Sequence, residues 1–370
     1  MRQESLLEEI SEDQPAPGQA PERRRCLAMV PGTCGELVQG SIDGVDFLVT
    51  CPVDRWSAAV AWRVQERDDS LAREGREGRE GQEDQEVQET VGLRRLWNSS
   101  NGLVRRHRLS LPAPAGAGSN AGYEKAGEAL RRAGNLGSGG PGFGSGPRPQ
   151  PVAGLAVDLW SEIQVGKGMA SSTADLVAVA AAAAAALEAD LSPEGLFQLA
   201  LSIEPSDAVM LPGITLADHL GGGVTRFLGE PPGLEVLVVD PGGALDTRSF
   251  NQIPGLQELN AKKEPQVRAA LEMVETGIRQ ADAVLVGKGA TLSAQAHQDL
   301  VANPIFDRAH SVAAKLGAVG VNVAHSGTVV GILFDPRERP AAEMLPLARR
   351  EMPGVGLEVC RVISGGVRRL

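Results

Sequence analysis

The sequence predicts an α+β fold in two lobes, and three observations lead to this prediction. The chain has 370 residues, which exceeds the usual size of one hydrophobic core, so two lobes of about 150 residues each are expected. Residues 26–64 contain short apolar runs that are typical of strands. After residue 152, helical patterns alternate with strands and glycine loops. This alternation indicates helices on one face of an antiparallel sheet.

Composition limits the kinds of partner that the protein could bind. With 42% hydrophobic and 22% charged residues the chain is globular, and its net charge of −11 argues against a nucleic-acid partner. No apolar run is long enough to cross a bilayer, and the first residues do not resemble a secretory signal. The four cysteines lack the spacing of metal ligands, which favours reduced thiols. We therefore expect a cytoplasmic protein that binds neither nucleic acid nor a membrane. A homodimer is compatible with the sequence.

Changes in composition divide the chain. Residues 1–25 are polar and without periodicity, which predicts a disordered tail. Residues 26–200 form the predicted N-terminal lobe, and residues 201–370 the C-terminal α+β lobe. Two low-complexity insertions interrupt the first lobe, at about 65–90 and 112–150. The second insertion contains one short helical pattern, at 123–133.

Local patterns place the elements. Pro31 and Gly32 interrupt an apolar segment, which predicts strand, turn and strand over 26–40. Further strands are expected at 47–50, 57–64, 103–111, 152–163, 234–239, 320–323, 329–334 and 356–363. Helices are expected at 172–188, 193–203, 265–279, 281–293 and 304–316. Ser192 followed by Pro193 is a good start for the second of these helices.

The most informative stretch is Q-V-G-K-G-M-A-S-S-T-A-D-L, at residues 164–176. Glycines let backbone N–H groups approach a ligand, and the start of the alanine-rich helix offers unpaired donors and a partial positive charge. This order predicts a phosphate-binding loop. Lys167 would add a cation, and the hydroxyl of Ser172 could bind Mg²⁺. The alternative is a glycine turn in which a Ser or Thr side chain caps the helix.

A second glycine-bearing turn, V-A-H-S-G-T at residues 323–328, lies between two apolar runs. Two loops that could hold phosphate are less easily explained by chance than one. The alternative is a hairpin turn that needs Gly327 only for a positive φ.

Three motifs resemble those of one enzyme superfamily. G-K-G-M-A-S-S-T-A at 166–174 is similar to the phosphate loop of the galactokinase, homoserine kinase, mevalonate kinase and phosphomevalonate kinase (GHMP) superfamily. P-G-T-C-G-E-L-V-Q-G at 31–40 resembles its first motif, and A-H-S-G-T-V-V-G at 324–331 its third. The motifs occur in the expected order. The resemblance implies an N-terminal β/α lobe like ribosomal protein S5 and a C-terminal ferredoxin-like α/β sandwich.

The resemblance also implies an activity, the ATP-dependent phosphorylation of a small alcohol. Together with I-E-P-S-D at 203–207, the motifs look most like those of the L-threonine kinases of cobalamin biosynthesis. Such enzymes make O-phospho-L-threonine for the aminopropanol linker of cobalamin. Homoserine kinase or another small-alcohol kinase is the alternative enzyme. A nucleotide-binding regulator without turnover, or a protein whose glycine loops are only turns, are the non-enzymatic alternatives.

Roles for individual residues follow from the resemblance. Asp207 would be the general base or orient the alcohol, and Lys167 would assist catalysis. Ser172 and Glu204 would share Mg²⁺. The substrate-contacting residues would be Glu36, Gln39, Ser326 and Gly327. ATP would contact Gly166, Gly168, Met169, Ala170, Ser171, Ser172 and Thr173.

Some of these roles have structural alternatives. Asp207 could form an Asx turn after Pro205, and Glu36 and Gln39 could simply end a strand. Ala170 replaces a glycine of the superfamily loop. Its N–H would still be supplied to phosphate if its φ is not positive.

Overall fold

The computed structural model describes residues 25–64, 105–111, 124–134, 154–243 and 256–369. The predicted disordered tail and the insertion at 65–90 lie outside these ranges, as does most of the insertion at 112–150. None of the described helices is long and apolar enough to cross a membrane.

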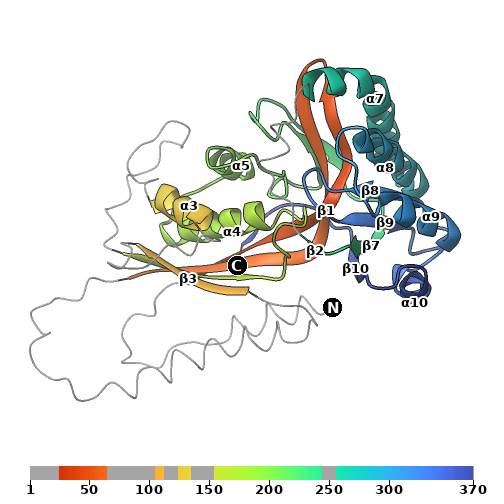
Figure 1. Cartoon of the computed structure of the whole chain (residues 1–370). Helices are drawn as coiled ribbons and strands as arrows, with labels where there is room; N and C mark the ends of the chain where they lie inside the picture. Colours follow the sequence, from red (N-terminus) through yellow and green to blue (C-terminus); the bar gives the residue numbers. More distant parts are fainter. Residues whose placement is uncertain (1–24, 65–104, 112–123, 135–153, 244–255, 370) are drawn as a thin grey trace, which may run out of the picture.

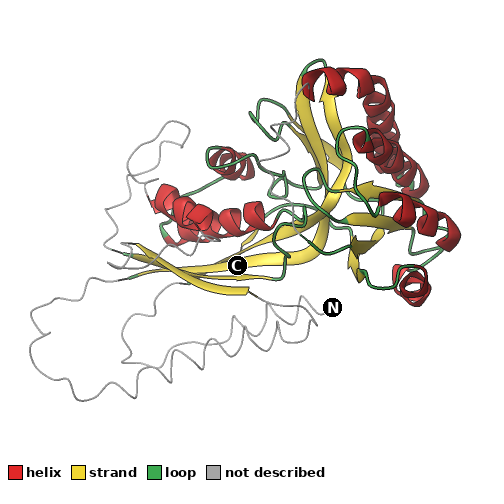
Figure 2. Ribbon diagram, in the orientation of Figure 1, coloured by secondary structure: helices red, strands yellow, loops and turns green. Residues whose placement is uncertain are grey.

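The described strands form one largely antiparallel sheet (Figures 1 and 2), in the order β10-β7-β9-β8-β1-β2-β4-β3. Three further strands lie off this path: β5 pairs with β2 and β6, and β11 pairs with β1. The bounds are β1 Cys26–Ile42, β2 Val45–Arg63, β3 Arg105–Leu111, β4 Leu155–Ser161, β5 Ile214–Ala217, β6 Thr225–Gly229, β7 Glu235–Asp240, β8 Gly320–Val323, β9 Val330–Phe334, β10 Gly356–Arg361 and β11 Arg368–Arg369. The α+β class predicted from the sequence is confirmed.

The first two strands form a long hairpin, and their boundaries differ from those predicted. The expected strand, turn and strand is one strand of 17 residues, β1, and the two strands expected next are one strand of 19 residues, β2. Pro31 and Gly32 do not turn the chain, because register shifts against β2 absorb them within the strand. The hairpin runs the length of the molecule in Figure 1.

The helices agree better with the sequence. Their bounds are α3 Glu124–Gly134, α4 Ser171–Ala186, α5 Pro193–Leu201, α7 Leu256–Gln280, α8 Ala283–Gln298, α9 Phe306–Leu316 and α10 Ala341–Glu351. The Ser192 hydroxyl accepts the N–H of Gly195 and caps α5, as predicted. Helix α7 begins earlier than expected and continues through Pro265. Strands β5, β6 and β11 and helix α10 were not predicted.

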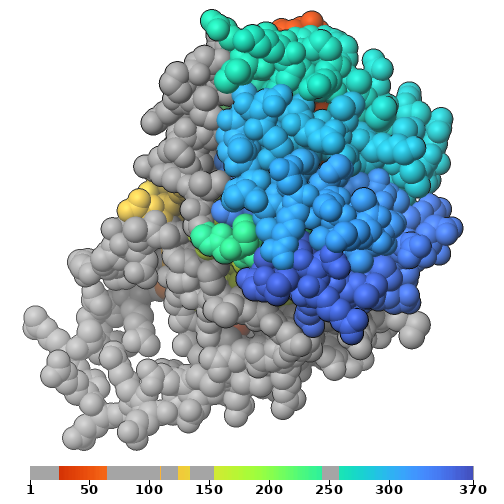
Figure 3. All heavy atoms as spheres, turned by 45° about the vertical axis from the view of Figure 1, so that its right-hand side comes forward, coloured from red at the N-terminus to blue at the C-terminus, as the bar shows by residue number. Residues whose placement is uncertain are grey.

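Helix α4 is the centre of the N-terminal half. Its alanines other than Ala185 are buried, and it packs against β1, β2, β4 and α3, because small side chains let the neighbouring backbones approach. Helices α7 and α8 pack against β1, whereas α9 and α10 cover β8, β9 and β10. In Figure 3 the face turned forward is formed largely by the segments after residue 256. The loop before α4 thus lies where β1 meets the helical C-terminal half.

Candidate active site

The three glycine motifs meet at the start of α4. Thr33 donates its N–H to Met169 O at 3.1 Å, and Thr328 donates its N–H to Lys167 O at 3.1 Å. A Cβ on Gly168 would lie 2.3 Å from Ala324 Cβ, and one on Gly327 would lie 2.2 Å from Lys167 O. The glycines are therefore required because the backbones of the loops touch one another.

This packing decides between the two interpretations of Gly327. Its φ lies outside the positive region, so the hairpin interpretation that needs a positive φ at Gly327 is wrong. The glycine instead permits close contact with the loop at 166–169.

Helix α4 begins without a side-chain cap. Its N-cap is Ala170, with φ 57° and ψ 28° and no hydrogen bond from a side chain. The alternative of a Ser or Thr cap is therefore wrong. The condition that Ala170 should have a φ that is not positive is also not met. The first amide bonded back to this cap is that of Ala174, at 2.9 Å from Ala170 O. The N–H groups of Ser171, Ser172 and Thr173 are the donors that an α-helix leaves without a helical partner, and they would suit an anion.

A pocket of about 240 Å³ opens beside this helix start. Its lining includes most of the loop at 165–173, together with Glu204 and Asp207. Ser172 Oγ donates a hydrogen bond to Glu204 Oε1 at 2.5 Å. Lys125, on α3, forms an ion pair with the other oxygen of Glu204. The structure thus brings together the predicted pair Ser172 and Glu204, and it adds a cation that sequence reasoning missed.

Asp207 lines the same pocket and is linked to Glu36. Glu36 lies on β1 with 3% of its surface exposed. Burial raises its pKa well above the usual value, and the nearby charge of Asp207 and a hydrogen bond to Asp207 add to this shift. The raised pKa favours the protonated form of Glu36, which can donate a hydrogen bond to the Asp207 carboxylate. Burial, followed by the charge of Glu204, raises the pKa of Asp207 to about 6.

Lys167 occupies a different place from the one expected. Its Nζ lies 2.7 Å from Asp240 Oδ1, and both residues line a separate cavity of about 1100 Å³. The Lys167 side chain is absent from the wall of the pocket that holds Glu204 and Asp207. A loop sequence does not specify toward which side a side chain points. The cation beside Glu204 is Lys125.

Gln39 also has a different environment from the one expected. It is buried, and its Nε2 donates to Val323 O at 3.2 Å. Its Oε1 lies 2.8 Å from Nδ1 of His325, and its N–H donates to Ser293 Oγ at 3.0 Å. Both ends of the amide therefore bind other parts of the protein, and Gln39 orients His325 instead of lining the pocket. Of the other two predicted substrate-contacting residues, Ser326 lines the pocket beside α4 and Gly327 does not.

Three histidines from separate segments gather beside the pocket. The rings of His219 and His325 lie 5.0 Å apart in an edge-to-face arrangement, and those of His297 and His325 lie 5.7 Å apart. Burial lowers the pKa of all three histidines, and it lowers the pKa of His297 to about 3. The charge of Lys263 lowers the pKa of His297 and His325 further. The cluster is therefore neutral at physiological pH. His219 and His325 line the pocket, and sequence reasoning gave His219 no role.

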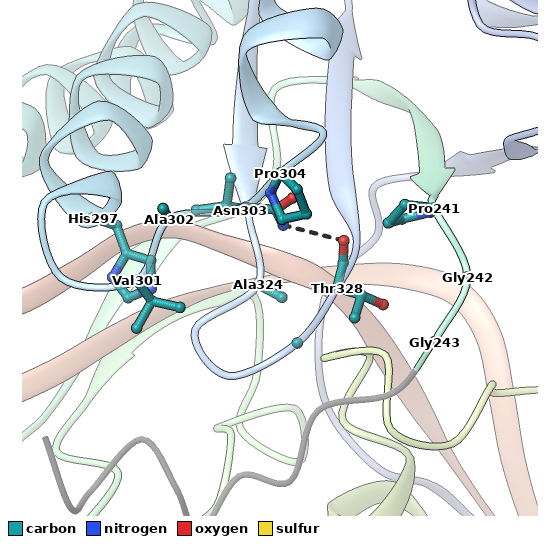
Figure 4. Close-up of a pocket in the computed structure, with 12 residues that line it drawn as sticks. Pro241, Gly242, Gly243, His297, Val301, Ala302, Asn303, Pro304, Ala324 and Thr328 are labelled. Atoms are coloured by element: carbon teal, nitrogen blue, oxygen red, sulfur yellow. Dashed lines mark hydrogen bonds between the residues drawn. The ribbon is translucent and has the colours of Figure 1, made fainter.

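A second cavity, of about 290 Å³, shares the loop at 324–328 with this pocket (Figure 4). Asn303 donates a hydrogen bond to Thr328 O at 3.1 Å and so fixes the loop from this side. His297 also lines the cavity. Its Nε2 lies 3.1 Å from His325 O. Asn303 and His297 thus both contact the backbone of the loop from this cavity.

Comparison with known proteins agrees with this architecture. Residues 128–212 match the N-terminal domain of GHMP kinases, and residues 274–349 match the C-terminal domain. The chain is 34% identical to an L-threonine kinase of Citrobacter freundii over 58% of this chain and 75% of the relative. It is 29% identical to an L-threonine kinase of Salmonella typhimurium over 92% of this chain and 95% of the relative. The chain belongs to the GHMP kinase family.

Solved structures show the same fold. A homoserine kinase from Cytophaga hutchinsonii superposes with a TM-score of 0.61 at 15% identity, covering 96% of this chain and all of the other. The mevalonate kinase of Methanococcus jannaschii superposes with a TM-score of 0.57 at 13% identity, covering 93% of this chain and all of the other. At these identities the likeness concerns the fold alone.

Proposed function

We propose that the protein is an ATP- and Mg²⁺-dependent kinase that phosphorylates the side-chain hydroxyl of L-threonine. The observation that supports this most directly is the hydrogen bond of Ser172 to Glu204 at the uncapped start of α4, with Asp207 in the same pocket. The two L-threonine kinases with which the chain shares 29% and 34% identity support the choice of substrate.

The pocket contains the groups that phosphoryl transfer needs. This reaction depends on positioning and on neutralising the charge of the phosphates. The amides of Ser171, Ser172 and Thr173 would bind phosphate oxygens, and the ammonium of Lys125 would offset their negative charge. Asp207 would accept the proton of the substrate hydroxyl. Its pKa of about 6 leaves it mostly ionised at pH 7 while keeping it basic enough for the transfer.

The donor set fits Mg²⁺. This ion prefers oxygen ligands and is commonly held in kinases by one or two side chains together with phosphate oxygens. Ser172 and Glu204 would supply two such oxygens. Within the ranges that the structure describes, no three His, Cys, Asp or Glu side chains gather to bind a metal by themselves. When bound, the metal would withdraw charge from the transferred phosphoryl group.

The ion pair of Lys125 and Glu204 would have to rearrange when metal and nucleotide enter. Lys125 occupies one oxygen of the carboxylate that would bind the metal. Because the Lys125 side chain is half exposed, it can swing to a phosphate oxygen at little cost. The predicted catalytic role of Lys167 would then fall to Lys125.

An acceptor series would test the proposal. ATP consumption would be measured with L-threonine, L-serine, L-homoserine and 1-amino-2-propanol, with and without Mg²⁺. We expect the highest kcat/KM for L-threonine. A preference for homoserine would favour the homoserine kinase alternative, and activity confined to a sugar or an isoprenoid alcohol would contradict the proposal.

Two variants would separate a kinase from a nucleotide-binding regulator. Asp207→Asn should lower kcat by about 10²-fold to 10⁴-fold, because it removes the base, while ATP still binds. Ser172→Ala should raise the Mg²⁺ concentration that is needed for half-maximal activity. Unchanged ATP turnover in both variants, with ATP still bound, would indicate the regulator. Three further features stay predictions of the sequence analysis: a role of the product in cobalamin biosynthesis, a cytoplasmic location and a homodimer.

A further inference from the structure

His219 is a buried imidazole without a hydrogen-bond partner in the described part of the chain. Only 7% of its surface is exposed, and its Nδ1 is buried with no partner in the described ranges. Its ring contact is with His325, whose edge-to-face geometry involves no hydrogen bond. Nε2 makes no hydrogen bond to the described residues either but is not closed off in this way, so it is the ring nitrogen that a ligand in the pocket can reach.

The backbone holds this ring at the pocket. His219 follows β5, and its carbonyl accepts the N–H of Ser206 at 3.1 Å. This bond ties His219 to the segment that carries Glu204 and Asp207. On the other side, the carboxylate of Asp218 accepts hydrogen bonds from three backbone N–H groups of the next turn, those of Leu220, Gly221 and Gly223. The ring is thus fixed by both flanks and by His325, and it lines the pocket.

The environment of the ring specifies which nitrogen carries the proton. Burial lowers the pKa of His219, against the opposing charges of Asp46 and Asp218, so the ring is neutral. A neutral imidazole has one N–H. Because Nδ1 is closed to water and has no acceptor near it, the proton belongs on Nε2. His219 therefore presents an N–H donor to a ligand in the pocket, and a donor suits a carboxylate rather than an ammonium group.

The lining of the pocket puts His219 within reach of an acceptor that is bound beside Asp207. The hydroxyl that receives phosphate must lie near Asp207 and the helix start. The remainder of an amino acid then contacts other residues that line the same pocket, among them Leu48, His219, His325 and Ser326. We propose that His219 donates a hydrogen bond to the α-carboxylate of the acceptor amino acid and thereby selects amino acids over simple amino alcohols. This inference rests on the proposed kinase function.

Two acceptors that differ only in the carboxylate test the inference. Wild-type protein and His219→Ala would be assayed with L-threonine and with 1-amino-2-propanol, and threonine binding would be measured by calorimetry. We expect His219→Ala to raise the KM and the Kd for L-threonine by about 10-fold to 100-fold. The KM for 1-amino-2-propanol and for ATP should stay within twofold.

Two further variants provide the controls. His219→Gln carries an amide N–H at about the position of Nε2 and should recover part of the threonine affinity. His310→Gln changes a histidine on α9 that stacks on Phe306 outside the pocket, and it should leave both acceptors unaffected. Melting temperatures would confirm that all variants fold.

The possible failures can be told apart. If wild-type protein phosphorylates no amino acid, the proposed function fails and the inference fails with it. If wild-type protein uses L-threonine but His219→Ala leaves its KM and Kd unchanged, only the inference is overturned. An equal loss for both acceptors in a folded variant would also overturn it, because the carboxylate would then not be the group that His219 recognises.

Discussion

Glu36, buried on β1, is hydrogen-bonded to Asp207, which follows α5 by six residues. The hydrogen bond from Glu36 lowers the pKa of Asp207 and so opposes the effect of burial. A residue of the first motif thus lowers the pKa of the proposed base, which lies in the second half of the chain.

This pair predicts how activity depends on pH. Asp207 must be ionised to act as a base, so kcat/KM should fall about tenfold per pH unit below its pKa of about 6. Glu36→Leu removes the hydrogen bond that lowers this pKa, and the acid limb should move to higher pH. Glu36→Gln keeps an N–H donor and should leave the limb in place. A limb that stays in place in Glu36→Leu would contradict the coupling.

Lys125 should contribute to nucleotide binding. Lys125→Ala is expected to weaken ATP binding by about 10-fold, because a charged hydrogen bond to phosphate is lost, and Lys125→Arg should preserve most of it. The matched control is Arg131→Ala, which removes an exposed cation that is paired with Glu128 on the same helix. Calorimetry with ATP would measure the effect. Equal binding by Lys125→Ala and Arg131→Ala would show that Lys125 makes no contact with the nucleotide.

Gly168 should be intolerant of any side chain. Its φ is +81°, and an added Cβ would overlap Ala324 and Gly327. Gly44, in the β1–β2 turn, has φ +77° with nothing within 4 Å of an added Cβ. Gly44→Ala should therefore cost about 1–2 kcal/mol of stability from the backbone conformation alone. Gly168→Ala should lower the stability by about 1–3 kcal/mol more, because the added Cβ overlaps its neighbours. It should also weaken ATP binding. Urea unfolding compares the two, and equal losses would show that the loops do not touch.

The histidine cluster should make the protein sensitive to acid. Burial holds the pKa of His297 at about 3, below its usual 6.5. Between these values the unfolded chain binds more protons than the folded one, so stability falls as the pH falls. At pH 5 this loss is about 2 kcal/mol for His297 relative to pH 7.5.

His297→Gln tests this sensitivity. The variant should lose about 2 kcal/mol of the difference in unfolding free energy between pH 7.5 and pH 5, because glutamine does not titrate. His310→Gln, on α9, serves as the control and should keep the full difference. If the unfolding free energy changes by the same amount between pH 7.5 and pH 5 in wild-type protein and in His297→Gln, the ring does not remain neutral in the folded state.

The sequence specified most of the helices, and the loop that precedes α4, well because their signals are local. The alanines of α4 and the pair Ser192 and Pro193 act within a few residues. The hairpin was divided wrongly because Pro31 and Gly32 resemble a turn locally, whereas pairing along β2 keeps the strand continuous. Long-range pairing outweighs such local preferences.

The site was predicted in part for a similar reason. Motifs indicated which backbones approach one another, and the contacts of Gly168 and Gly327 agree with them. They could not indicate where long side chains point, so Lys167 was given a role for which Lys125 is better placed. His219 lies in a glycine-rich stretch without a motif. One signal could have identified it, namely a histidine between Asp218 and a run of three glycines that follows the acidic segment at 204–207.

The long β1–β2 hairpin has a consequence for any attempt to divide the enzyme. Glu36, on β1, is paired with Val323 of β8, and Val362, which follows β10, is bridged to Val53 of β2. A fragment that begins at about residue 201 would lack the strands on which its own sheet is completed. Such a fragment should be insoluble when expressed alone, and it should become soluble when the fragment that carries the hairpin is produced beside it.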